Sequence, residues 1–142
     1  MTTTQKTKIT VQTTVNSPMQ TVWDYFTNPK HIVNWNNASP DWHTTRAEND
    51  LQPGGSFTSR MEAKDGSTGF DFEGVYQEVE KYSFYSYIMD DGRYVEVSFK
   101  KVPDGIEIAE TFDAETANSL EMQENGWQAI LDNFKTYTES HG

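Results

Sequence analysis

The sequence has 142 residues and a formal net charge of −11, because 22 Asp and Glu residues outnumber 11 Lys and Arg residues. This balance excludes the basic surface on which binding to nucleic acids and anionic membranes depends, and the absence of Cys excludes disulfides and thiol chemistry. The chain contains neither an apolar signal segment nor a run of about 18 apolar residues. We therefore expect a cytoplasmic protein that binds no nucleic acid and no membrane.

The expected core is unusually aromatic. The chain has 4 Trp, 7 Tyr and 8 Phe residues, which together outnumber its Leu, Ile and Val residues. One aromatic side chain buries about 150–250 Å², so these residues can build a core that is poor in leucine. We predict a single domain over residues 1–142, with an ordered core at about 8–139.

The first expected elements are a strand and two short helices. Residues 8–15 alternate between apolar and polar side chains, which predicts a half-buried strand. Ser17 is typical of a helix N-cap and Pro18 of the first helical residue. Asn28 and Pro29 then end this helix and cap a second short one. The apolar residues of the two helices are Met19, Val22, Trp23, Phe26, Ile32, Val33 and Trp35.

The middle of the chain predicts an irregular loop followed by a meander of strands. Residues 36–55 show no regular pattern, and loops of this length are often functional. Beyond them, three Asp-Gly pairs predict tight turns between antiparallel strands. The expected strands are residues 57–63, 69–79, 82–89, 93–102 and 106–112.

A long amphipathic helix is expected over residues 119–138. Asn118 and Glu121 resemble a capping box at its start, and Gly126 is expected to permit a close backbone approach. No other element is long enough to cover the sheet, and the first strand should join one sheet edge. The predicted fold class is therefore α+β, with a curved six-stranded antiparallel sheet around the C-terminal helix and two short helices after the first strand.

Five short motifs occur in order over about residues 9–138. They are Ser17-Pro18 before Val22-Trp23, Thr27-Asn28-Pro29 leading to Trp35, Asp50-Leu51 with Pro53-Gly54-Gly55, Gly74 with Glu78-Val79, and Gly126-Trp127 leading to Leu131. In this the chain resembles the helix-grip domains of the START-like (SRPBCC) superfamily, and within them the heat-shock protein 90 ATPase activator homologue family. Gln52 stands where that family commonly has Arg. The resemblance implies a cavity for an apolar ligand between the sheet and the terminal helix, and the family name implies chaperone ATPase activation.

Aromatic and apolar residues are expected to surround this cavity and to bind the ligand. Ligand pockets combine apolar walls with a few polar groups, which Tyr hydroxyls would supply here. The alternative is that the rings pack against one another and fill the space. The candidate ligand-binding residues are Trp35, Trp42, Phe57, Met61, Phe72, Tyr76, Phe84, Tyr85, Trp127, Ile130 and Phe134.

Glu110 is the candidate catalytic residue. In the phase set by Ile108 and Phe112 its carboxyl group points inward, where burial raises the pKa, as it does in many general acids and bases. The alternatives are a bulge or strand end that exposes Glu110 to water, or a structural partner such as Arg60 or Arg93.

Three functions follow from these observations. The first is a non-enzymatic START-like domain that binds a small hydrophobic or aromatic molecule. The second is a protein-interaction module of the heat-shock protein 90 ATPase activator type, and the third is a cyclase-like or hydrolase-like enzyme that uses a cavity carboxylate. His31, His43 and His141 form no close pair, so no metal and no cofactor is expected. The expected partners are the small molecule and a chaperone or other protein, with the chain as a monomer or a homodimer.

Overall fold

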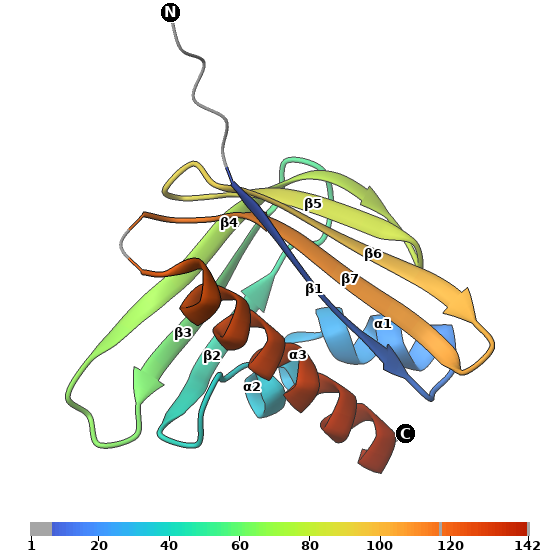
Figure 1. The fold of residues 1–142 in the computed structure, drawn as a ribbon, viewed down its shortest axis with the longest axis horizontal. Coiled ribbons are helices and arrows are strands. Elements are labelled where there is room, and N and C mark those ends of the chain that lie inside the picture. Colours follow the sequence, from blue (N-terminus) through green and yellow to red (C-terminus); the bar gives the residue numbers. More distant parts are fainter. Residues whose placement is uncertain (1–6, 117, 142) are drawn as a thin grey trace, which may run out of the picture.

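The computed structural model describes residues 7–116 and 118–141. A curled antiparallel sheet forms a half-barrel, and a long C-terminal helix lies along its open side (Figure 1). The strand order in the sheet is β1-β7-β6-β5-β4-β3-β2. The elements are β1 (Lys8–Val15), α1 (Met19–Thr27), α2 (Pro29–Trp35), β2 (Trp42–Asn49), β3 (Ser56–Ala63), β4 (Gly69–Glu80), β5 (Phe84–Met89), β6 (Tyr94–Val102), β7 (Gly105–Asp113) and α3 (Leu120–His141).

The Asp-Gly turns lie where the sequence predicts them, between β3 and β4, β5 and β6, and β6 and β7. Gly66 and Gly92 have φ angles of 80° and 90°, in the left-handed region that favours glycine. The first strand joins the edge of the meander as expected, because β1 pairs antiparallel with β7. The expected antiparallel meander is therefore confirmed.

Within the residues that the structure describes, the sheet has seven strands rather than the expected six. The additional strand, β2, occupies part of the predicted loop over residues 36–55 and pairs with β3. Its sequence is mostly polar, its register shifts between Thr44 and Arg46, and it forms a sheet edge. An edge strand with one partner and a bulge does not require alternating apolar and polar residues. The residues of β2 therefore lack the alternation from which the other half-buried strands are predicted.

Two of the three expected helix caps are wrong. Helix α1 begins after Pro18, and the buried hydroxyl of Ser17 has no hydrogen-bond partner among the described residues. At the start of α3, the Ser119 hydroxyl accepts from the Met122 N–H at 3.1 Å, so Ser119 replaces Asn118 as the cap. The third cap is confirmed, since the Asn28 side chain accepts from the Lys30 N–H at 3.0 Å.

Aromatic rings fill the part of the interior between α1, α2 and the C-terminal half of α3. The Phe26 ring lies 5.1 Å from Trp35, 5.4 Å from Phe99 and 4.8 Å from Phe134, measured between ring centroids. Phe134 itself has no exposed surface. At this end of the molecule the rings pack against one another, as the alternative interpretation of the sequence predicts.

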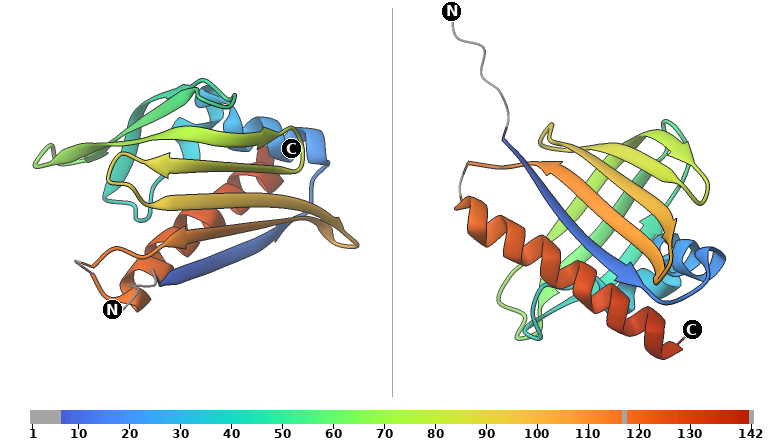
Figure 2. Two further views of the ribbon diagram at one scale, coloured as in Figure 1. Left: turned by 90° about the horizontal axis from the view of Figure 1, so that it is seen from above. Right: turned by 45° about the vertical axis from the view of Figure 1, so that its right-hand side comes forward.

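Helix α3 lies over one side of the half-barrel only (Figure 2). It packs against β1, α1 and α2. The side chain of Lys135 donates to the Thr14 carbonyl at 2.6 Å, and that of Gln128 donates to the Gln12 carbonyl at 3.0 Å, so polar contacts attach α3 to β1.

Candidate functional site

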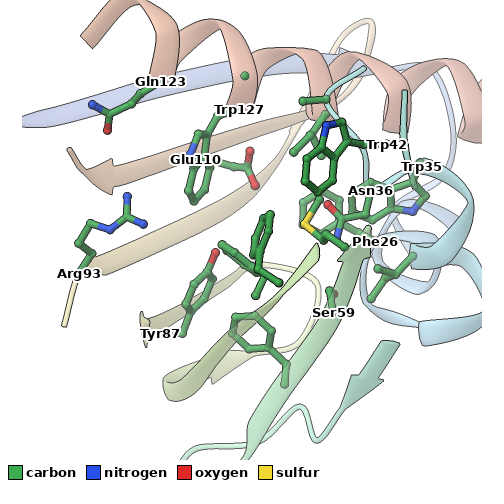
Figure 3. Close-up of a pocket in the computed structure, with 18 of the residues that line it drawn as sticks. Phe26, Trp35, Asn36, Trp42, Ser59, Tyr87, Arg93, Glu110, Gln123 and Trp127 are labelled. Carbon is green, nitrogen blue, oxygen red and sulfur yellow. The ribbon is translucent and has the colours of Figure 1, made fainter. Parts of the chain in front are cut away.

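A cavity of about 990 Å³ lies between the concave face of the sheet and α3 (Figure 3). Its walls come from α1, α2, β2 to β5, β7 and the N-terminal half of α3. Two lining residues, Phe70 and Met122, are 48% and 61% exposed, so the cavity opens to solvent where β4 and α3 face each other. The volume is that of a site for a small organic molecule.

Nine of the eleven candidate residues line this cavity. Phe134 does not, because it is packed between the rings of Phe26 and Trp35. Phe84 does not either, since its neighbour Tyr85 faces the cavity and successive side chains of a strand point to opposite faces. The residues that line it as expected are Trp35, Trp42, Phe57, Met61, Phe72, Tyr76, Tyr85, Trp127 and Ile130. Their role in binding a ligand stays a prediction.

Several residues that line the cavity were not among the predicted ligand-binding residues. Tyr87 lies two positions after Tyr85, so strand alternation alone could have identified it. Phe70 likewise alternates with Phe72 on β4. Arg93 and Gln123 carried no comparable signal, because a turn and a helix start bring them to the cavity.

Tyr76 attaches the floor of the cavity to the strands beside it. Its hydroxyl donates to the Asn49 side-chain oxygen at 2.5 Å, and the Asn49 amide donates to the Thr27 carbonyl at 2.7 Å. This chain of hydrogen bonds links β4, β2 and α1. Burial raises the pKa of Tyr76, so the hydroxyl stays protonated and acts as a donor.

Glu110 faces the cavity from β7, as the strand phase predicts (Figure 3). Neither proposed partner reaches it, because Arg60 pairs with Glu62 and Asp71, and Arg93 pairs with Asp91. Burial raises the pKa of Glu110 from 4.5 to about 8, so the carboxyl group is mostly neutral at pH 7. A neutral carboxyl group can both donate and accept a hydrogen bond. Whether it catalyses a reaction stays a prediction.

Gly126 faces open space rather than a close neighbour. A Cβ atom added to it would meet no other atom within 4 Å, and the residue lines the cavity. The expected close backbone approach is therefore wrong. Glycine at this position leaves the cavity wider than any other residue would.

His31 and His43 do not line the cavity. His31 contacts the Tyr137 hydroxyl at 2.7 Å through Nδ1, and His43 lies in β2 rather than in the expected loop. The side chain of His141 lies outside the described part of the chain. Within residues 7–116 and 118–141, no three His, Cys, Asp or Glu side chains are grouped as metal ligands would be. The helices of that same part are too short or too polar to cross a lipid bilayer.

The half-barrel, the crossing helix and the cavity agree with a match between residues 16–139 and the model of one protein family, the Activator of Hsp90 ATPase homolog 1-like protein. The chain belongs to this family. Among solved structures, an AHSA1-like protein from Aeromonas hydrophila is 47% identical, with a TM-score of 0.90 over 96% of this chain and 94% of that chain.

Chr148 from Cytophaga hutchinsonii is 46% identical to this AHSA1-like chain, with a TM-score of 0.79 over 96% of this chain and 93% of its own. Protein NE0264 from Nitrosomonas europaea, at 17% identity, has a TM-score of 0.80 over 94% of this chain and 95% of its own, and it shares the fold. No functionally curated protein matches the chain. The AHSA1-like fold supports, in general terms, a domain that binds a ligand or interacts with another molecule.

Proposed function

We propose that this AHSA1-like chain is a non-enzymatic binding domain that holds a small hydrophobic or aromatic molecule in the cavity between the sheet and α3. The observation that carries the proposal is a cavity of about 990 Å³ lined mainly by aromatic and apolar side chains. A cavity of this size that opens to solvent holds water when no ligand is present. Replacing water that contacts apolar walls by an apolar molecule is favourable.

The expected gain is large enough for useful affinity. A ligand that removes about 200 Å² of apolar surface from water gains about 5 kcal/mol at 25 cal/mol per Å². Aromatic contacts with Trp127, Phe72 and Tyr87 add to this gain, while the loss of translational and rotational freedom reduces it. A net gain of about 5 kcal/mol corresponds to a Kd of about 0.2 mM, so affinity weaker than micromolar is expected for a simple apolar compound.

A thermal-shift experiment with a neutral aromatic compound tests the proposal. A ligand present at 100 times its Kd stabilises the folded state by about 2.7 kcal/mol, which raises Tm. We expect 2-(biphenyl-4-yl)ethanol to raise the Tm of the wild-type chain. Gly126→Leu should lose this response, because its side chain extends into open space of the cavity.

Gly126→Ala is the matched control, since it adds one methyl group and leaves most of the cavity free. It should keep the Tm response. If neither this compound nor aromatic analogues of either charge raise the wild-type Tm, the proposed binding function is wrong.

A second function is favoured by a separate observation. Leu120 and Met122 at the start of α3 are 50% and 61% exposed, and exposed apolar side chains are common in protein-interaction surfaces. We propose as the alternative a protein-interaction module that activates the ATPase of an Hsp90 chaperone. Purified chain should then increase ATP hydrolysis by a bacterial Hsp90, and Leu120→Ser should reduce the increase. No change in hydrolysis with saturating chain would exclude this function.

A further inference from the structure

Most of the charged groups that line the cavity have protein partners or are well exposed. Arg93 Nε donates to Asp91 Oδ2 at 2.8 Å, so its positive charge is balanced. Glu115 accepts from the Asn118 side chain at 2.5 Å, and Glu48 is exposed. Among the described residues, Glu110 has neither a hydrogen bond nor an ion pair. The charged lining residues are Glu48, Arg93, Glu110 and Glu115.

Aromatic rings surround the carboxyl group of Glu110. Tyr85 and Tyr87 lie close enough that its charge raises the pKa of both hydroxyl groups further. Trp127 lies beside it in the cavity (Figure 3). The Trp127 ring stacks on Phe112, two residues along the same strand, with 3.8 Å between ring centroids. The faces of such rings carry partial negative charge and attract cations.

We propose that the natural ligand is an apolar molecule with one protonated amine, whose N–H group donates to Glu110 while aromatic rings surround its positive charge. This inference rests on the proposed binding function and specifies its ligand class. An ammonium group supplies the partner that Glu110 lacks, and the apolar body fills the remaining cavity. The net charge of −11 also attracts cations to the protein in preference to anions.

Other ligand classes fit the cavity less well. A carboxylate can accept a hydrogen bond from Glu110 only while Glu110 is protonated, and above pH 8 the two negative charges repel each other. The nearby cation, Arg93, is already paired with Asp91. A neutral alcohol can accept a hydrogen bond from the protonated carboxyl group, but it does not use the attraction of the rings for a cation. The amine is the class that uses both features.

Binding of an amine should depend on pH through Glu110 alone. Its neighbours across the sheet, Val11 on β1 and Val97 on β6, are uncharged. Burial raises the pKa of Tyr85 and Tyr87 on β5 well above 10, so both stay neutral between pH 6 and 9. On α3 the neighbour is the uncharged Trp127, and at the β5–β6 turn the Arg93 guanidinium is paired with Asp91.

The direction of the pH dependence follows from the same site. The pKa of Glu110 is about 8 in the empty cavity, so the carboxyl group must lose its proton when an ammonium group binds. The association constant of an amine should therefore rise about twentyfold between pH 6.5 and 8.5, and binding should release a proton. An alkylammonium group remains protonated over this range, as that of Lys does.

Three probes of one shape and different charge test the inference by titration calorimetry. They are 2-(biphenyl-4-yl)ethylamine, 2-(biphenyl-4-yl)ethanol and biphenyl-4-ylacetic acid. At pH 8.5 we expect the amine to bind at least tenfold more tightly than the alcohol, and the acid to bind most weakly. Only the amine should gain affinity with rising pH.

Two variants test whether the preference for the amine and its pH dependence arise from the carboxyl group of Glu110. Glu110→Gln should reduce the affinity for the amine to that for the alcohol and abolish its pH dependence. Glu107→Gln is the matched control, because Glu107 lies on the same strand and does not line the cavity. It should bind all three probes as the wild type does. The pH series on the wild-type chain gives an answer even if a variant fails to fold.

The outcomes separate the two proposals. Equal affinity of amine and alcohol at pH 8.5, or tightest binding of the acid, would overturn the amine inference and leave the binding function intact. Failure of all three probes to bind would overturn both. A preference for the amine that Glu110→Gln leaves unchanged would also contradict the inference, because the charge would then be recognised elsewhere.

Discussion

The unpartnered carboxyl group of Glu110 should make the stability of the protein fall as pH rises. Its pKa is raised from 4.5 in the unfolded chain to about 8 in the fold, so the folded state binds more protons between these values. Stability is therefore greatest below pH 4.5 as far as this group is concerned, and it is lost as pH rises towards 8. The loss between pH 4.5 and 7 is about 3 kcal/mol, at 1.36 kcal/mol for each pKa unit.

Glu110→Gln removes this dependence, because the amide is neutral at every pH. In urea denaturation, the variant should be about 3 kcal/mol more stable than the wild type at pH 7 and nearly equal to it at pH 4.5. Glu107→Gln also removes one negative charge, so its difference from the wild type measures the effect of net charge alone. A difference between Glu110→Gln and the wild type that stays the same from pH 4.5 to 8 would refute the reasoning, since the carboxyl group would then ionise freely in the fold.

Three further changes test the packing and the helix. Gly126→Ala should stabilise the chain by about 1 kcal/mol, since Ala has a higher helix propensity and its methyl group meets no neighbouring atom. If urea denaturation shows a lower stability instead, another group must pack against this methyl group. Phe134→Ala should cost about 3–5 kcal/mol, because its fully buried ring packs between Phe26 and Trp35; a cost below 1 kcal/mol would mean that this end is loosely packed. Ser119→Ala should lower stability by about 1 kcal/mol through loss of the helix cap, and an equal loss in Asn118→Ala would contradict the assignment of the cap.

The sequence predicted those parts of the fold that local chemistry determines. The Asp-Gly pairs fixed three turns, because Gly at these positions adopts conformations that other residues avoid. The stripe from Trp127 to Tyr137 predicted α3, because its spacing matches a helix with one buried face. Strand β2 was missed because its stability comes from pairing with β3, which a polar sequence does not reveal.

The site was predicted less completely than the fold. Phe84 and Tyr85 were both predicted to line the cavity because both are aromatic. Adjacent side chains of a strand point to opposite faces, so only Tyr85 lines it. Phe134 and Phe72 are the same residue type, yet Phe134 lies in the packed core and Phe72 in the cavity wall. The packing of α2 against α3 places Phe134 in the core, and the sequence does not show this packing. The neutral aromatic character of the walls was visible in the sequence, whereas the positions of Arg93 and Gln123 depend on how distant segments meet.

The pairing of β1 with β7 joins residues that are about a hundred positions apart, and Lys8 and Asp113 form an ion pair at 2.7 Å across it. Contacts of such long range form late in folding. Closing the loop between the two strands costs chain entropy, and only the contacts between both strands offset this cost. On the ribosome, the hairpins from β3 to β6 can form before β7 and α3 have been synthesised. The nascent chain therefore exposes its aromatic concave face until the last helix emerges to cover part of it.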